Sequence, residues 1–240
     1  PIRPFLSPLW VACAPARSAG SSAAPRAERR RLPAHLVHTV RFREALWWLQ
    51  AFFRRQRGAL HRVHLAHTPV DDTLVFTCDA SPWGIGGVLF HGTRPIAYYA
   101  DPVHDVDLAR FDAARGESSF LTTWEALSVL VAMRLWRSPS SRAARAWVTS
   151  DSLAATLAIA RGASSASRLG LILRELALED AELNSRIESV RHIPGLATNL
   201  ADSLSRLWAP EPHLIPPALL KARRDVPPKR GRSWYLTLSY

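Results

Sequence analysis

The stretch Leu74–Tyr99, LVFTCDASPWGIGGVLFHGTRPIAYY, decides the predicted fold. Two short segments that contain glycine, Ala80–Gly84 and His91–Thr93, divide it into apolar runs. Short β-prone runs joined by tight turns are typical of an antiparallel meander. We therefore predict three consecutive strands, at Leu74–Asp79, Ile85–Phe90 and Pro95–Tyr99.

After this meander the pattern changes to alternating helices and strands. Residues 101–120 are polar and acidic, which favours a loop with a helical turn. Thr122–Trp136 has apolar residues at steps of three and four, as expected for a helix. The other predicted elements are a strand at Ala146–Thr149, helices at Ser152–Arg161 and Leu169–Leu183, a strand at Ile187–Arg191 and a helix at Asn199–Trp208. This order predicts an α/β fold: a mixed five-stranded sheet, meander first and parallel crossovers afterwards, with helices on both faces.

Four acidic residues stand at characteristic places on these elements. Asp79 and Asp151 close the β-like runs Leu74–Thr77 and Ala146–Thr149, while Glu125 and Asp202 lie near the starts of helical segments. If the two strands are neighbours, all four carboxylates can converge at one edge of the sheet. Anions that close repel one another unless divalent cations lie between them. The pattern therefore indicates a magnesium-dependent phosphodiester hydrolase.

Each acidic residue also has a simpler structural explanation. Asp79 could begin an Asx-turn, and Glu125 could complete a capping box started by Thr122. Asp151 could be a helix N-cap, and Asp202 could complement a helix dipole. The catalytic interpretation depends on all four acidic residues together. The simpler explanations would need four coincidences, in this order and on these elements, to account for the same pattern.

The charge of the chain is unevenly distributed. The 240 residues carry a net charge of +11, with twelve basic and two acidic residues in 1–70 and thirteen basic and sixteen acidic residues in 71–208. Basic flanks around a mildly acidic centre fit a polyanionic partner such as nucleic acid, although disordered basic linkers would produce the same totals. The chain has no run of about eighteen apolar residues, so the sequence predicts no membrane span. The presence of only two cysteines argues against a disulfide framework and favours a reducing, intracellular compartment.

Composition divides the chain into four parts. We expect 1–35 to be a flexible linker or the end of an upstream domain, and 36–70 to be a basic helical connection segment. Residues 71–208 would form the catalytic domain, and 209–240 a Pro/Arg-rich, extended tail. Because the chain begins with Pro1, we also expect it to be a fragment or a processed piece.

Several other residues that could suggest a site do not predict a metal centre or a nucleophile of their own. His61, His64 and His67 would share one side of a helix, but without acidic or cysteine partners nearby they do not predict a zinc site. Trp83, next to the Asp79 turn, could stack on a nucleotide. Ser81, Ser150 and Ser152 have no general base nearby in sequence, which argues against a serine nucleophile.

Over residues 70–208 the chain resembles the ribonuclease H domain of retroelement reverse transcriptases, in particular those of gypsy-type and DIRS-type elements. The similar motifs are Tyr98-Tyr99-Ala100, Thr122-Thr123-Trp124-Glu125-Ala126-Leu127, His192-Ile193-Pro194-Gly195, Asn199 and Ala201-Asp202-Ser203-Leu204-Ser205-Arg206. Asn199 falls one position later than in many gypsy-type members, and the short Gly162–Ser167 break leaves no room for the basic handle helix of cellular ribonucleases H.

The resemblance implies roles for five residues. The family carboxylates correspond to Asp79, Glu125, Asp151 and Asp202, and the family's loop histidine corresponds to His192. Asp79 would bridge two Mg²⁺ or Mn²⁺ ions, which lie about 3.5–4 Å apart in comparable sites, and His192 would assist proton transfer. The implied substrate is the RNA strand of an RNA–DNA hybrid, and the implied partner is an upstream reverse transcriptase polymerase domain.

Two alternatives to this enzyme remain at the level of sequence. One is a catalytically inactive connection-type module of a reverse transcriptase, which grips template and primer without turnover; the intact carboxylates count against it. The other is a different nuclease of the ribonuclease H-like superfamily, such as an integrase core. The helical position of Glu125 and the ending from His192 to Arg206 argue against that choice.

Overall fold

The computed structural model describes residues 6, 9, 43–54, 74–136, 146–164, 166–182, 187–192, 198–231 and 234–235. Several predicted features lie outside these residues: the linker over 12–34, the three histidines His61, His64 and His67, and Pro194–Gly195. Helix α2 (Arg43–Phe53) forms within the segment predicted to be helical. In the described part of the chain, no helix combines the length and apolar character needed to cross a bilayer.

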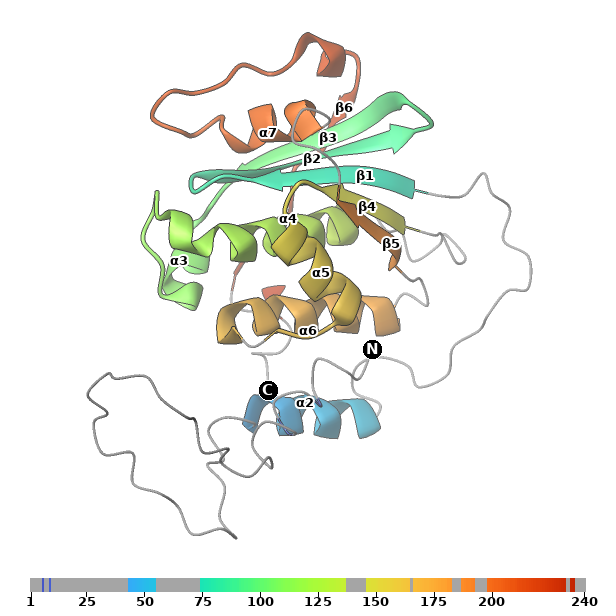
Figure 1. The fold of residues 1–240 in the computed structure, drawn as a ribbon, viewed down its shortest axis with the longest axis vertical. Coiled ribbons are helices and arrows are strands. Elements are labelled where there is room, and N and C mark those ends of the chain that lie inside the picture. The colour runs from blue at the N-terminus through green and yellow to red at the C-terminus, as the bar shows by residue number, and fades with distance from the viewer. Residues whose placement is uncertain are drawn as a thin grey trace, which may run out of the picture.

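A six-stranded mixed sheet organises the fold, in the order β5-β4-β1-β2-β3-β6 (Figure 1). Its strands are β1 (Leu74–Ala80), β2 (Gly84–His91), β3 (Arg94–Pro102), β4 (Ala146–Ser150), β5 (Ile187–His192) and β6 (Arg223–Arg224). The first three strands form the antiparallel meander, and β4 and β5 continue the sheet in parallel with β1. The predicted α/β class and mixed topology are therefore confirmed. The sixth strand, β6, pairs in parallel with β3 and was not predicted.

Helices cover both faces of the sheet, as predicted. Figure 1 shows α7 on one face of the sheet, together with the 3₁₀ turn that precedes β6, and the other α-helices of the domain on the opposite face. Their bounds are α3 (Asp105–Phe111), α4 (Leu121–Trp136), α5 (Leu153–Arg161), α6 (Ser167–Glu182) and α7 (Asn199–Ser205), with short 3₁₀ turns at Ser118–Phe120 and Pro217–Leu219.

The main core lies between the sheet and α4, with α6 packed on the far side of α4. Phe76, Ile85 and Tyr99 of the sheet and Trp124 and Leu127 of α4 are all fully buried. Because α4 is covered on two sides, twelve of its sixteen residues are buried. This enclosure makes α4 a rigid support for whatever side chain its first turns carry.

A smaller core holds α7 on the opposite face. Val88 and Leu204 are completely buried there. A Cβ atom at Gly86 would lie 2.6 Å from both the Ala201 carbonyl oxygen and the Leu204 Cβ. Glycine at this position therefore permits the close approach of α7 to β2.

Candidate active site

Two parallel strands end side by side with an acidic residue each. In the register of β1 and β4, Thr77 lies opposite Thr149, and their hydroxyl oxygens are 2.7 Å apart. Asp79 and Asp151 each follow two residues later. The carboxyl ends of parallel strands lie at the same edge of a sheet, so these two carboxylates meet at that edge.

Helix α4 brings a third carboxylate to the same edge. One oxygen each from Asp79, Glu125 and Asp151 lies within 4.8 Å of the other two. Asp79 and Glu125 are only 3% and 4% exposed. The Ser150 hydroxyl donates a hydrogen bond to Glu125 Oε2 at 3.3 Å, which helps to orient that carboxylate.

Helix α7 contributes from the other face of the sheet. Ser205 Oγ donates a 2.8 Å hydrogen bond to Asp79 Oδ2. Asp202 borders the cluster but is not one of the three mutually close carboxylates. Its side chain is 31% exposed, and its Oδ1 accepts a 2.6 Å hydrogen bond from Arg206 Nε. The structure thus gathers three of the four predicted carboxylates and places the fourth beside them, paired with an arginine.

The electrostatics of this edge are unfavourable for so many anions. Burial raises the pKa of Asp79 to about 7, with further increases from Asp151 and Asp202, against the hydrogen bond from Ser205. Burial also raises the pKa of Glu125 well above its usual range, and the charges of Asp79 and Asp151 add to that increase. A positive charge among these oxygens would relieve both effects.

The donor set fits a hard divalent cation. All three mutually close ligand atoms are carboxylate oxygens, which Mg²⁺ and Mn²⁺ prefer, and no histidine or cysteine is part of this group. Among the described residues, these three are the ones that could hold an ion together.

His192 reaches the same edge from a neighbouring strand. It is the last residue of β5, where its Cα is paired with that of Ser150 in β4. Its side chain is exposed. The predicted strand ends at Arg191, with His192 in the loop that follows; in the structure the strand is one residue longer because its pairing with β4 continues to Ser150. His192 therefore lies on the strand next to β4, opposite the residue that precedes Asp151.

The structure excludes two of the simpler structural explanations and supports a third. Ser152, not Asp151, is the N-cap of α5, since its side chain accepts a hydrogen bond from Ala155 N at 3.3 Å. Thr122 lies inside α4, so it does not begin a capping box with Glu125. Asp202 does lie in the first turn of α7, where a carboxylate also complements the helix dipole.

Two serines that hold this site together were not recognised from the sequence. Ser205 is completely buried and binds Asp79, and Ser81 is 2% exposed and donates to the Ser205 carbonyl oxygen at 2.7 Å. The local signal was present, because Ser81 and Ser205 stand two and three residues from predicted ligands. Their roles nevertheless depend on the contact between β1 and α7, which no local pattern reveals.

Comparison with known proteins adds a likeness of fold. No protein-family model matches the chain, and no curated protein matches it. Among solved structures, the chain is similar to the LC11 ribonuclease H1 isolated from compost by a metagenomic approach, with a TM-score of 0.43 and 13% sequence identity. That likeness covers 55% of this chain and 92% of the other. At this identity it concerns the path of the chain alone.

Proposed function

We propose that the chain is a divalent-metal-dependent nuclease of the ribonuclease H type that cleaves the RNA strand of RNA–DNA hybrids. One observation carries the proposal: three carboxylates from β1, α4 and β4 have oxygens within 4.8 Å of one another. Such a cluster of closely spaced, largely buried carboxylates is suited to hold a cation at the end of a sheet.

Each acidic residue has a proposed role. Asp79, Glu125 and Asp151 would hold one Mg²⁺ ion, and Asp79 with Asp202 would hold a second. When bound, the ions supply a water of lowered pKa and stabilise the oxygen that leaves. Ser205 and Ser150 keep Asp79 and Glu125 in fixed orientations through the hydrogen bonds that they donate. These contacts limit the reorganisation that substrate binding would require.

Two further side chains act around the carboxylates in this proposal. His192, exposed at the end of β5, would carry a proton to or from the leaving group. Arg206, whose side chain is 47% exposed, would turn from Asp202 towards the phosphate backbone of the substrate. The hybrid substrate and the origin of the chain in a retroelement reverse transcriptase are proposed from the family resemblance of the motifs over residues 70–208.

A cleavage assay tests this proposal. Purified protein is incubated with an RNA–DNA hybrid, an RNA duplex and a DNA duplex, each with Mg²⁺, with Mn²⁺ and with a chelator. We expect cleavage of the RNA strand of the hybrid alone, only with metal. Asp79→Asn should lower the rate by about a thousandfold or more, since it removes a ligand common to both ions.

The same assay separates the alternatives. Binding of the hybrid without turnover, by a folded protein supplied with metal, would contradict the proposal and favour a connection-type module. Cleavage of the DNA duplex in place of the hybrid would favour another nuclease of the superfamily. Asp151→Asn serves as a second variant, because it removes a ligand of only one proposed ion.

A further inference from the structure

The segment that follows α7 returns across the domain. We call residues 217–235 the C-terminal strap; the structure describes 217–231 and 234–235 of it. Leu219 is buried in the core on the α7 face, while Tyr235, 1% exposed, belongs to the main core on the opposite face. Between them, β6 pairs with the outer edge of β3. The strap therefore passes around one edge of the sheet instead of extending into solvent.

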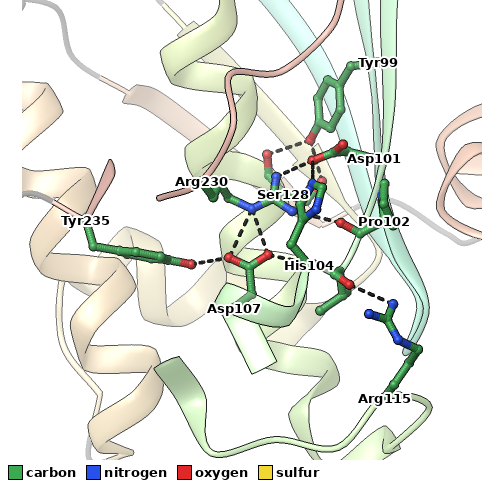
Figure 2. Close-up of polar contacts among 10 residues, drawn as sticks. Tyr99, Asp101, Pro102, His104, Asp107, Arg115, Ser128, Arg230 and Tyr235 are labelled. Atoms are coloured by element: carbon green, nitrogen blue, oxygen red, sulfur yellow. Dashed lines mark hydrogen bonds and ion pairs between the residues drawn. The ribbon is translucent and has the colours of Figure 1, made fainter. Parts of the chain in front are cut away.

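Arg230 is the most enclosed charge on the strap. Its side chain is 0% exposed and forms an ion pair with Asp107, with Nε 2.8 Å from Oδ2. Its two terminal nitrogens contact Asp101 Oδ2 and the Pro102 carbonyl oxygen, the latter at 2.9 Å (Figure 2). Tyr235 donates a 2.7 Å hydrogen bond to the other oxygen of Asp107.

All three groups that Arg230 binds belong to one short segment, Asp101–Asp107, which we call the β3–α3 corner. Arg115 holds this corner from another side, with Nη1 donating to the Val103 carbonyl oxygen at 2.8 Å. A planar guanidinium that contacts three acceptors at once fixes their relative positions as well as neutralising charge. Removal of the arginine would leave two carboxylates without that partner.

The corner is bonded in turn to the turn that follows Asp79. Pro102 lies opposite Gly84 in the register of β2 and β3, and Val103 N donates to the Trp83 carbonyl oxygen at 3.0 Å. The Trp83 turn begins at Ser81, whose Oγ accepts from Trp83 N at 3.2 Å and Gly84 N at 3.1 Å. The corner thereby holds the backbone that orients Ser81.

Ser81 completes the connection to the carboxylates. Its hydroxyl donates to the Ser205 carbonyl oxygen at 2.7 Å, and Ser205 Oγ donates to Asp79 Oδ2 at 2.8 Å. Continuous hydrogen bonds and strand pairing therefore run from Arg230, through the corner and the Trp83 turn, to Asp79.

We propose that Arg230 is a positioning residue for the catalytic edge: through the β3–α3 corner and the Trp83 turn, it fixes the Ser81–Ser205–Asp79 arrangement. The proposal rests on the proposed function. It makes the strap part of the working enzyme and not only a stabilising cover. Because contiguity alone does not establish coupling, the test must measure it.

Three variants of the full chain provide the test. Arg230→Met removes the charge and the planar fork, and Arg230→Lys keeps the charge but loses the fork. Arg223→Met is the matched control on the same strap, since the Arg223 side chain is 71% exposed and pairs with Asp225 outside the corner. Each is assayed for hybrid cleavage at a temperature where circular dichroism shows it folded, across a series of Mg²⁺ concentrations.

We expect Arg230→Met to lower kcat by about ten- to a hundredfold and to raise the Mg²⁺ concentration for half-maximal activity, because small misplacements of catalytic groups have effects of that size. Arg230→Lys should fall in between, and Arg223→Met should stay within about twofold of the parent, as expected for a surface change. A lower melting temperature with unchanged kcat and Mg²⁺ requirement would overturn the proposal.

A double-mutant cycle keeps the test decisive if Arg230→Met does not fold. Ser81→Ala and Arg230→Lys are made singly and together; coupled residues give a combined effect that differs from the product of the single effects by more than about twofold. Multiplicative effects would overturn the proposal.

Failure of the proposed function shows itself separately, as a folded parent protein that cleaves no hybrid. In that case Mn²⁺ binding by the parent and by Arg230→Lys is measured by titration calorimetry. Weaker Mn²⁺ binding by the variant would support a role of Arg230 in positioning the carboxylates. Equal binding, or none by either protein, overturns the proposal.

Discussion

The carboxylate cluster and the Arg230 cluster both bury aspartates, but they neutralise them differently. Asp107 is completely buried and is bound by a buried arginine and a tyrosine hydroxyl of the same chain. Asp79 is 3% exposed and receives a serine hydrogen bond, with Glu125 and Asp151 close by. A buried carboxylate is therefore not by itself a sign of catalysis. The two clusters differ in whether the fold places a buried cation against the carboxylate.

The largest effect that tests this contrast is the loss of charge at Asp107. Asp107→Asn leaves Arg230 buried with a weakened partner, so the free energy of unfolding should fall by about 3–5 kcal/mol. Asp79→Asn, the same chemical change in the other cluster, should leave stability unchanged or raise it, since it removes an anion from a crowded site. Urea denaturation of both variants without metal measures the difference. Equal destabilisation by the two changes would contradict this difference between the two clusters.

The stability of the metal-free protein should depend on pH, because no buried cation among the described residues neutralises the Asp79 carboxylate. Its pKa rises from 3.8 to about 7 on folding. Between these values the native state keeps a proton that the unfolded state has released, so stability without metal should fall as the pH rises through this window and level off above it. The fall should be on the order of a few kcal/mol.

Added Mg²⁺ should restore stability at pH 8 by binding the native state. The variant Asp79→Asn should show a weaker dependence on both pH and Mg²⁺. Thermal unfolding at pH 5 and pH 8, with Mg²⁺ and with chelator, provides the measurement. A parent protein that becomes more stable across the same window in chelator would contradict the assignment.

A smaller effect concerns the contact that brings α7 to the carboxylates. Gly86→Ala places a methyl group where the Ala201 and Leu204 atoms leave no room, which should cost about 1–3 kcal/mol of stability. Because α7 carries Ser205 and Asp202, the variant should also require more Mg²⁺ for activity, whereas it should leave the Arg230 cluster intact. Gly92→Asn is a suitable control, since nothing lies within 4 Å of that position and asparagine tolerates its positive φ.

The smallest effect is expected from the exposed ion pair on the strap. Arg223 contacts Asp225 at 2.6 Å, but its side chain is 71% exposed. Arg223→Ala should therefore leave the midpoint of urea denaturation close to that of the parent, because water screens an exposed ion pair. A loss as large as that of Asp107→Asn would show that the strap is held by its surface charges and not by Arg230.

Local patterns were sufficient for much of the architecture. The turns at Ala80–Gly84 and His91–Thr93 predicted the meander, and the spacing of apolar residues predicted α4. Both signals arise from short-range geometry: tight turns need particular residues, and a buried helix repeats every three to four positions. The helix within 101–120 was harder to predict. Helix α3 has only seven residues, too few for a clear apolar period, and its first turn is held by a hydrogen bond from His104 N to the Asp107 carboxylate.

The candidate site was only partly visible in the sequence. Asp79, Glu125 and Asp151 were predicted as a group, and their convergence followed once β1 and β4 were assumed to be neighbours. Asp202 was assigned to the same group, yet the structure places it at the border with Arg206. The roles proposed for these residues and for His192 stay predictions until activity is measured.

By itself, the sequence determined the mixed α/β class, the order of the elements and the residues that supply negative charge, because these depend on local turn geometry, periodicity and side-chain chemistry. Only the tertiary structure decided which carboxylates come within reach of one another and that the Pro- and Arg-rich ending folds back onto the domain. The reason is physical: Arg230 finds its partners at Asp101 and Asp107, more than a hundred residues earlier in the chain. Burial of such a charge is favourable only when those distant partners are already in place.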